Sequence, residues 1–331
     1  MEPVRVGVWG VGAWGEKHAR VYAASPAAEL VGVYDRNHER ASQVAARHGC
    51  HAFASGDDLL RQVEAVSVAV PTLAHREVVE QALAAGRHVL VEKPMAATLG
   101  EAEAMIAAAR RAGATLQVGQ VERFNPAFLA ARSRVRNVKF VEAHRLALFQ
   151  PRSLDVDVVF DLMIHDIDLV LQAVADTPAS LSAVGVAVLS SNEDIANARL
   201  EFADGCVANL TASRVSQERL RRIRFFQDDA YLSVDLFERR CEHLSLDRDL
   251  LGSAAPNLLT LAAAIRRDPI VVGSGEPLAL EVEAFLASLR GGGEGAASAL
   301  AGRDALAVAE GVREAMQRRA RQWVVRPSGV S

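Results

Sequence analysis

Short hydrophobic runs alternate with alanine-rich stretches along the first 120 residues of the chain. The stretches predict helices near residues 14–24, 37–48, 57–62, 74–86 and 98–112, and the runs predict strands at VRVGVWG, ELVGVYD, AVSVAV, HVLVE and TLQVGQ. This alternation is typical of a parallel sheet that is covered by helices on both faces. The fold class expected for residues 1–120 is therefore α/β, a doubly wound Rossmann domain.

The pattern changes after Asn125-Pro126, where the β-rich stretches become longer. They predict strands over residues 138–149, 180–190, 195–203, 206–216 and 221–236. Asp204-Gly205 is a strong signal for a two-residue hairpin turn. Helices are predicted over residues 158–174, 276–290 and 302–320. We expect a second, α+β domain over residues 121–331, built on a large and mostly antiparallel sheet.

The predicted helix over residues 158–174 is hydrophobic but carries a polar seam. Asp161, His165, Asp168 and Gln172 recur at i, i+4, i+7 and i+11, which places them on one face. The neighbouring stripe is apolar, so most of the helix should be buried. The polar seam is then a solvent-exposed edge of the helix, a metal site, or one side of a catalytic site. We expect no bound metal, because no second cluster of histidine or cysteine accompanies the seam.

The first predicted strand is followed by Gly10-Val11-Gly12-Ala13-Trp14-Gly15. A GxGxxG between a strand and a helix is the fingerprint of a dinucleotide site. Its first glycine permits a tight turn, its second lets the backbone approach the pyrophosphate, and its third lets helix and strand pack closely. The phosphates lie over the helix N-terminus, where unpaired N–H groups favour negative charge. Candidate cofactor-binding residues are therefore Gly10, Gly12, Ala13, Trp14 and Gly15.

An acidic residue, Asp35, ends the second predicted strand 20 residues after Gly15. Its carboxylate should accept hydrogen bonds from the adenosine ribose and repel a 2′-phosphate, which favours NAD over NADP as the cofactor. The adjacent Arg36 tempers this preference, since it could shield a phosphate or stack on adenine. Both residues are candidate cofactor contacts.

Two further strand ends should point at the same cleft, because ligands of doubly wound sheets bind outside the carboxyl ends of the strands. Pro71 and Thr72 follow one strand, and His75 lies in the first turn of the next helix. These are candidate cofactor contacts, although a helix-capping role would explain Thr72 almost as well. Glu92 and Lys93 are two further candidate cofactor contacts; they end the next strand before a proline, which should hold this lysine more rigidly than a surface lysine.

Composition narrows the possible partners of the chain. A formal net charge of −4 argues against sequence-independent binding to nucleic acid or to an anionic membrane. No hydrophobic run reaches the roughly 18 residues that would span a bilayer, and the N-terminus has no signal-peptide pattern. The scattered cysteines Cys50, Cys206 and Cys241 suit a reducing compartment. We expect a cytoplasmic protein without nucleic-acid or membrane partners.

The segments GVGAWG, VPTxxH, VEKP and DxxxHDxD, in this order, resemble the glucose-fructose oxidoreductase and inositol dehydrogenase family of NAD(P)-dependent sugar oxidoreductases. The resemblance extends over nearly the whole chain. It implies an open-faced sheet in the second domain, through which members of the family commonly build homodimers or homotetramers. By position, Lys93, Asp161 and His165 match the family's catalytic lysine, aspartate and histidine.

QVGQVERFNPAF at 117–128 and PRSLDVDVVFDLMIHDIDLV at 151–170 resemble the branch that oxidises the 3-hydroxyl of UDP-N-acetylglucosamine or its uronic acid. Such a branch would serve amino-sugar synthesis for bacterial surface polysaccharide or lipid A. The resemblance implies that Arg123, Asn125 and Arg152 face the sugar nucleotide. Asp168 is expected either to contact the substrate or to support a residue that does. Gln120 departs from the histidine expected in this branch. Alternatively, the two arginines form interdomain salt bridges.

Oxidation of a secondary alcohol needs a base for the hydroxyl proton and a group that stabilises the developing oxyanion. His165 and Lys93 are both candidates for the base, and Asp161 would orient a ring or a substrate hydroxyl, whereas Asp166 is expected to be structural. Two alternative functions remain open. One is a dehydrogenase of a free polyol or simple sugar, and the other is a dinucleotide-binding sensor without catalytic turnover.

Overall fold

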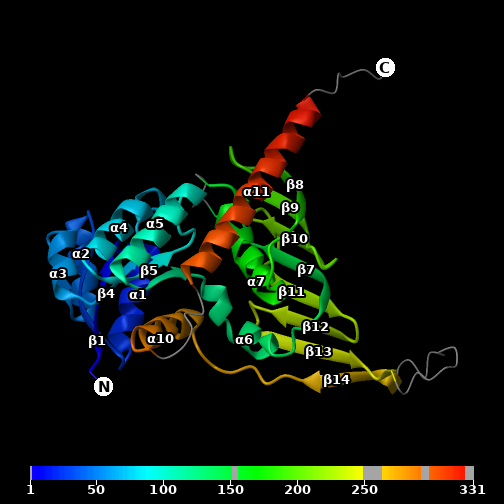
Figure 1. Ribbon diagram of the computed structural model, residues 1–331, viewed down its shortest axis with the longest axis horizontal. Coiled ribbons are helices and arrows are strands. Elements are labelled where there is room, and N and C mark those ends of the chain that lie inside the picture. The colour runs from blue at the N-terminus through cyan, green and yellow to red at the C-terminus, as the bar shows by residue number, and fades with distance from the viewer. Residues whose placement is uncertain (1, 151–155, 249–262, 292–297, 325–331) are drawn as a thin grey trace. The chain divides into compact units, whose positions relative to one another are not determined.

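The computed structural model describes residues 2–150, 156–248, 263–291 and 298–324 (Figure 1). The chain divides into two compact units. Unit 1 comprises residues 1–124 and 275–306, and unit 2 comprises residues 125–274 and 307–331. The hydrophobic pattern placed residues 275–306 in the second domain, whereas these residues fold with unit 1.

Unit 1 is built on a six-stranded parallel sheet with the order β3-β2-β1-β4-β5-β6, which is the order of a dinucleotide-binding fold. Its strands are β1 (Val4–Trp9), β2 (Ala28–Tyr34), β3 (His51–Ala52), β4 (Ala65–Val68), β5 (His88–Glu92) and β6 (Leu116–Gly119). Its helical segments include α1 (Ala13–Ala24), α2 (His38–His48), α3 (Gly56–Gln62), η1 (Thr72–Ala74), α4 (His75–Ala84), α5 (Leu99–Ala112) and η2 (Val121–Phe124). The Rossmann prediction is confirmed; the two-residue β3 was missed because it is too short to show a period.

Local sequence fixes the ends of these helices. Asn37, Ser55 and Thr98 cap α2, α3 and α5, and each side chain accepts a hydrogen bond from a backbone N–H of the first turn. Gly49 and Gly113 end α2 and α5 in the left-handed conformation, which glycine adopts at little cost. The helix boundaries therefore follow from residues that a sequence shows directly.

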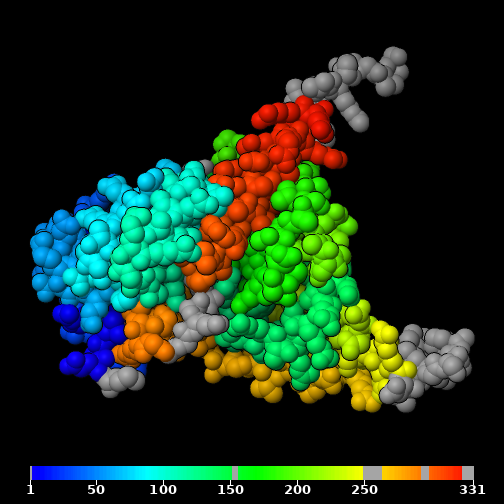
Figure 2. Space-filling view, viewed as in Figure 1, coloured from blue at the N-terminus to red at the C-terminus, as the bar shows by residue number. Residues whose placement is uncertain are grey.

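Helix α10 (Pro277–Leu289) explains why a segment late in the sequence belongs to unit 1. Its buried residues Leu278, Val282, Phe285 and Leu286 enter the same hydrophobic core as the apolar residues of α1 and β1. Figure 2 shows α10, in orange, beside the blue N-terminal elements. The hydrophobic period of a helix identifies the face to be buried but not the element that covers it.

Unit 2 is built on an eight-stranded sheet with the order β14-β13-β12-β11-β7-β10-β9-β8. Its strands are β7 (Val138–Leu146), β8 (Ser180–Val186), β9 (Ile195–Glu201), β10 (Val207–Ser213), β11 (Leu220–Gln227), β12 (Ala230–Asp235), β13 (Arg240–Leu246) and β14 (Ile265–Pro269). Strand β7 pairs with β10 in parallel, and the other pairs in the described part of this sheet are antiparallel. The expected mostly antiparallel sheet is confirmed.

The structure refines several predicted elements of unit 2. The predicted hairpin between β9 and β10 is present, but it is not a two-residue turn at Asp204-Gly205. The N–H of Gly205 donates to the carbonyl of Phe202, so the central residues of the turn are Ala203 and Asp204, and Gly205 follows them at a φ of +87°. The β-rich stretch 221–236 is two antiparallel strands, β11 and β12. The described helical segments include α6 (Pro126–Arg132), η3 (Val159–Met163), α7 (Ile164–Val174) and α11 (Ala299–Val324), whose first residues belong to unit 1. Among the described helices, none is both long enough and apolar enough to cross a membrane.

The two faces of the unit 2 sheet differ in burial. Val141, Ala143 and Arg145 of β7 are buried on the face against which α7 packs. The alternate residues are half-buried, and on that open face the ring centroid of Phe226 lies 5.5 Å from that of Phe140 and 5.1 Å from that of Tyr231. The open-faced sheet implied by the family resemblance is therefore present in the structure.

A buried ion pair holds α7 on this sheet. The Nε and Nη2 atoms of Arg145 donate to the two carboxylate oxygens of Asp166, at 3.0 and 2.7 Å. Both side chains are almost fully buried. A two-pronged contact fixes orientation as well as distance. The prediction that Asp166 is structural is confirmed.

The helix that carries the polar seam is not regular. Residues Val159–Met163 form a π-helical turn, in which the backbone N–H of Ile164 donates to the carbonyl of Val159, and α7 starts only at Ile164. The prediction of one regular helix over residues 158–174 is therefore wrong for the first turn, which is π-helical. Such π-helical turns occur often at functional sites, and this one contains Asp161.

Candidate active site

The three glycines of the motif, here called the glycine cradle, differ in the space around them: two are closely packed against backbone and one faces open space. A Cβ atom on Gly10 would lie 2.8 Å from the carbonyl oxygen of Ala69, and Gly10 has a φ of +88°. A Cβ atom on Gly15 would lie 1.8 Å from the carbonyl oxygen of Gly10. A Cβ atom on Gly12 would meet nothing within 4 Å. The protein itself requires glycine at two positions, and the third position leaves space beside the backbone.

Helix α1 begins beside that space. Gly12 is its N-cap and, as a glycine, has no side chain to accept a hydrogen bond from the first turn. Ala13 and Trp14, the first two residues of the helix, are exposed. Uncapped N–H groups and the positive end of the helix dipole suit an anionic group. These residues therefore fit the pyrophosphate of a dinucleotide.

Asp35 follows β2 and is held by three donors. Its Oδ2 accepts from the N–H of Val11 at 2.9 Å, and its Oδ1 accepts from the N–H of Asn37 and from Arg40, both at 2.8 Å. Burial would raise the pKa of Asp35, but these hydrogen bonds outweigh burial and lower it below its ordinary value of 3.8. Asp35 is therefore ionised at neutral pH, as a ribose-binding carboxylate requires.

Arg40 also forms an ion pair with Asp35. Arg36 is exposed on the surface of unit 1. The pairing of Arg40 with Asp35 has no signal in the local sequence, because it forms only when the first turn of α2 brings the residue five positions later back to the carboxylate.

His75 connects the loops that follow β4 and β5. Its Nε2 lies 2.9 Å from the carbonyl oxygen of Val70, and its Nδ1 lies 3.0 Å from that of Pro94. A neutral imidazole has only one N–H, so the two carbonyls together favour the protonated ring. Burial has the larger effect and lowers the pKa of His75. The side chain is 1% exposed, which makes it a clamp on these loops rather than an open cofactor contact.

The neighbouring residues Pro71 and Thr72 lie at the surface end of β4. Pro71 is exposed and Thr72 is half-buried. Thr72 begins the short helix η1, and the N-cap of α4 is Ala74 without a side-chain hydrogen bond. The capping alternative for Thr72 is therefore not found, and its hydroxyl remains a candidate cofactor contact.

A buried chain of hydrogen bonds leads to Lys93. The hydroxyl of Tyr22 lies 2.8 Å from that of Ser67, which lies 3.1 Å from Nδ1 of His18. The Nε2 atom of His18 lies 2.8 Å from Oε1 of Glu92, whose Oε2 accepts from the backbone N–H of Lys93 at 3.2 Å. Lys93 itself is half-buried and precedes a cis peptide bond to Pro94. Glu92 thus positions the lysine backbone.

In unit 2, Asp161 and His165 are half-buried and one turn apart along η3 and the start of α7. Asp168 was expected to lie on the same accessible seam, but the structure buries it and leaves it 1% exposed. The accessible part of the seam is therefore shorter than the sequence pattern predicted.

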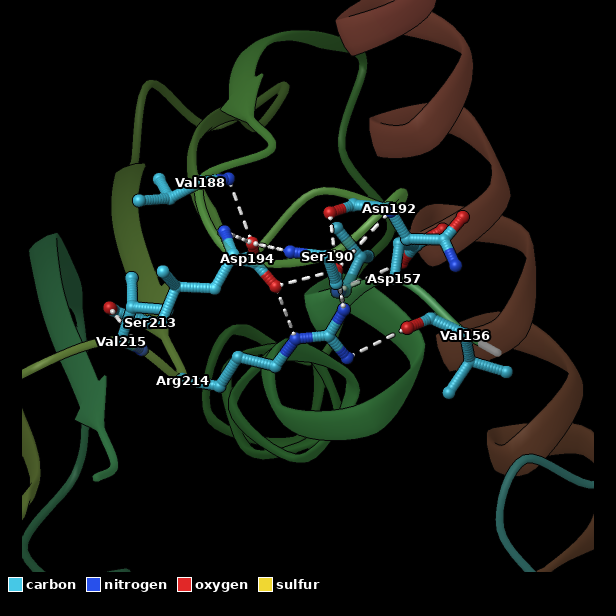
Figure 3. Close-up of polar contacts among 11 residues, drawn as sticks. Val156, Asp157, Val188, Ser190, Asn192, Asp194, Ser213, Arg214 and Val215 are labelled. Atoms are coloured by element: carbon cyan, nitrogen blue, oxygen red, sulfur yellow. Dashed lines mark hydrogen bonds and ion pairs between the residues drawn. The ribbon is translucent and has the colours of Figure 1, made fainter. Parts of the chain in front are cut away.

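The start of this turn is held by a buried network, drawn in Figure 3. Arg214 donates to Asp194 at 2.8 Å and to the carbonyl oxygen of Val156 at 2.8 Å. Asp194 also accepts from the backbone N–H groups of residues 188, 189 and 190. Asp157 accepts from the N–H groups of Val159 and Phe160 at 2.9 and 3.2 Å. This network fixes the backbone four residues before Asp161.

The remaining predicted substrate residues have mixed placements. Arg123 is buried in η2. Asn125 is buried; it caps α6 by accepting from Ala127 at 3.1 Å, and its Nδ2 donates to the carbonyl oxygen of Leu236 at 2.9 Å. Gln120 is 2% exposed. Arg152 lies outside the described residues.

The lowered pKa of His75 gives a prediction for stability. The unfolded chain binds the proton near the ordinary pKa of 6.5, and the folded chain binds it only at lower pH. The stability contributed by the neutral ring is therefore complete above pH 6.5 and is lost as the pH falls through the folded-state pKa. Urea unfolding at pH 7.5 and 5.5 should show a smaller loss on acidification for His75→Gln than for the wild-type protein.

The histidines His48 and His88 also have pKa values that burial lowers, and they are present in both proteins, so the difference isolates His75. An equal loss of stability in both proteins would contradict the clamp role of a neutral His75.

Comparison with known proteins places this site in a family. The model of the oxidoreductase family with an NAD-binding Rossmann fold matches residues 4–120, and that of the GFO/IDH/MocA C-terminal domain matches residues 106–233. The UDP-N-acetylglucosamine 3-dehydrogenase of Acidithiobacillus ferrooxidans is 40% identical over 315 residues, which are 95% of this chain and 97% of that protein. An inositol 2-dehydrogenase of Rubrobacter xylanophilus is 37% identical over 50% of this chain and 51% of its own.

A solved structure of the Acidithiobacillus ferrooxidans enzyme superposes with a TM-score of 0.88, at 39% identity, over 96% of this chain and 99% of that one. A levoglucosan dehydrogenase at 19% identity shares the fold, with a TM-score of 0.83 over 96% of this chain and 98% of its own. The glycine cradle, the ionised Asp35 and these matches lead to one conclusion: the chain belongs to the GFO/IDH/MocA family of NAD-dependent oxidoreductases that act on CH–OH groups.

Proposed function

We propose that this protein oxidises a secondary hydroxyl, at C3, of a UDP-N-acetylhexosamine or its uronic acid to the 3-keto sugar, with NAD as the oxidant. The observation that carries this proposal is the 40% identity to a UDP-N-acetylglucosamine 3-dehydrogenase over 95% of the chain, which includes both units. Relatives that act on free polyols match a shorter part of the chain.

The residues of unit 1 would hold NAD. Gly12 and the first turn of α1 would bind the pyrophosphate, and Asp35 would accept hydrogen bonds from the adenosine ribose. When bound, NAD accepts the hydride from the carbinol carbon. The protein then has to place the sugar, remove the hydroxyl proton and stabilise the negative charge that develops on oxygen.

Three side chains would carry this chemistry. His165 is suited to act as the base because imidazole can take up a proton at neutral pH, and Lys93 supplies a positive charge for the developing oxyanion. Lys93 can also serve as the base if it binds substrate in its neutral form. Asp161 would accept a hydrogen bond from a sugar hydroxyl or orient the base. We therefore assign proton transfer to His165 and Lys93 as a pair and positioning to Asp161.

Substitution of this group should reduce turnover. Lys93→Met and His165→Asn should each lower kcat by about 10²- to 10⁴-fold, which is the usual contribution of general acid–base catalysis. His165→Asn and Asp161→Asn lie outside the NAD-binding unit, so their affinity for NAD should be unchanged. Lys139→Met is the matched control, since Lys139 is an exposed lysine on β7. Near wild-type turnover in both Lys93→Met and His165→Asn would exclude the mechanism.

A panel of substrates separates the proposed function from its alternatives. UDP-N-acetylglucosamine, its uronic acid and myo-inositol are incubated with the enzyme and NAD, and NADH is followed by its absorbance. We expect NADH with a UDP sugar and a product that has lost two hydrogens by mass. NADH with myo-inositol alone would indicate a polyol dehydrogenase. NAD binding without NADH from any of the three would indicate a sensor.

The biological setting is part of the same proposal. A 3-keto sugar nucleotide is a substrate for amination, so the product would supply amino-sugar synthesis for bacterial surface polysaccharide or lipid A. The free cysteines Cys50, Cys206 and Cys241 suit the cytoplasm, where sugar nucleotides would be used. Trapping of the keto product by a sugar aminotransferase, detected by mass, would support this setting, and failure to aminate it would contradict it.

We further propose that the open face of the unit 2 sheet forms a homodimer or homotetramer. This face carries the half-buried ring cluster of Phe140, Phe226 and Tyr231. Light scattering during gel filtration should report a dimer or tetramer for the wild-type protein. Phe226→Glu would place a charge in the contact and should shift the protein toward monomer, while a wild-type monomer would refute the proposal.

A further inference from the structure

A cavity of about 170 Å³ in unit 2 adjoins the turn that carries Asp161. Its hydrophobic walls include Leu146, Leu148, Leu162 and Phe237. Its polar lining is Gln150, Asp161, Arg214, Arg219 and Arg221. The volume is smaller than the roughly 300–1,000 Å³ of pockets that enclose a whole drug-sized ligand. The cavity can therefore take one part of a sugar nucleotide but not all of it.

The arginines of strand β11 belong to two opposite faces of the sheet. Arg221 pairs in register with Arg145, whose side chain reaches Asp166 of α7, so Arg221 lies on the face that α7 covers. Arg222 and Arg224 lie on the open face, where they form ion pairs with Asp235 and Glu142.

The sequence of β11 on the covered face changes from apolar to basic. Ile223 and Phe225 are fully buried in the core, and Arg221, two positions earlier, is exposed at the cavity. Arg219 precedes the strand and is also exposed at the cavity. The hydrophobic core thus ends at a pair of guanidinium groups beside Asp161.

Arg214 has a different part in this cavity. Its guanidinium is buried, and its donors are directed to Asp194, Ser190 and the carbonyl oxygen of Val156 (Figure 3). The charge of Arg214 is therefore balanced within the protein. Arg219 and Arg221 place two further guanidinium groups in the cavity lining, and Asp161 is the acidic residue among the lining residues that the structure describes.

We propose that Arg219 and Arg221 bind the diphosphate of the substrate, an inference that rests on the proposed function. A diphosphate diester carries two negative charges, and arginine is the side chain best suited to two-pronged contacts with phosphate. Asp161 repels phosphate but accepts hydrogen bonds from sugar hydroxyls. The cavity therefore orients the substrate, with the diphosphate toward the arginines and the sugar toward Asp161. This assigns the diphosphate to residues other than the buried Arg123.

Binding of UDP and of uridine, measured by calorimetry with saturating NAD present, tests this assignment. Saturating NAD occupies the dinucleotide site, so that UDP cannot report on it. The double variant Arg219→Gln/Arg221→Gln should bind UDP about 100-fold more weakly than the wild-type protein, at roughly 10-fold for each charged contact. Its affinity for uridine, which lacks phosphate, should be unchanged. The UDP affinity of Arg221→Lys should fall between those of the wild-type protein and the double variant, because lysine keeps the positive charge but cannot form two parallel hydrogen bonds to phosphate.

Arg222→Gln is the matched control, since it removes an arginine from the same strand on the opposite face. Its UDP affinity should stay within about twofold of the wild-type value. Unchanged UDP affinity in the double variant, or no UDP binding by the wild-type protein, would overturn the assignment. The proposed function is judged separately, by NADH formation from the UDP sugars, so failure of the assignment can be told apart from failure of the proposed function.

Discussion

The ion pair between Arg145 and Asp166 fixes the helix that carries the candidate catalytic residues of unit 2. Both groups are buried, so removal of either would leave a charge in a region of low polarity, which typically costs about 3–5 kcal/mol. Two parallel hydrogen bonds leave α7 little freedom to rotate about its axis. Because His165 directly precedes Asp166, the pair also sets the direction in which the imidazole leaves the helix. A second buried pair, Asp194 with Arg214, holds the start of the preceding turn. The candidate catalytic segment is thus fixed at both ends by charges that β7 and the end of β10 supply.

Unit 1 reaches the same kind of rigidity by a different route. Its polar groups at the strand ends are joined mainly by hydrogen bonds between side chains and backbone carbonyls or N–H groups. His75 spans two loops, and Glu92 links His18 to the backbone of Lys93. Such networks are strong when every member is satisfied and costly when one is removed. The lysine is therefore positioned by residues on three different elements, α1, β5 and α4.

The sequence predicts most of unit 1 because its determinants are local. Hydrophobic runs, helix caps and the spacing of Gly10, Gly12 and Gly15 can each be recognised within a few residues. What was missed depends on partners far away in the chain. His18 is an ordinary position of an amphipathic helix until Glu92 is placed beside it, and the apolar face of α10 shows no preference for unit 1. Asp194 lies in a polar loop whose role appears only when Arg214 is close. The π-helical turn at Asp161 has no periodic signal, because one widened turn changes the spacing only once.

The three glycines of the cradle differ in the reason for which each is needed. At Gly15 the obstacle to any side chain is the carbonyl of Gly10, and at Gly10 it is the carbonyl of Ala69, so the chain's own backbone forbids substitution at both. At Gly12 the protein offers no obstacle. A side chain at Gly10 or Gly15 would therefore disturb folding whether or not a nucleotide is present, whereas a side chain at Gly12 would obstruct only a molecule that occupies the adjacent space. The single GxGxxG pattern therefore combines two different requirements, one for folding and one for ligand binding.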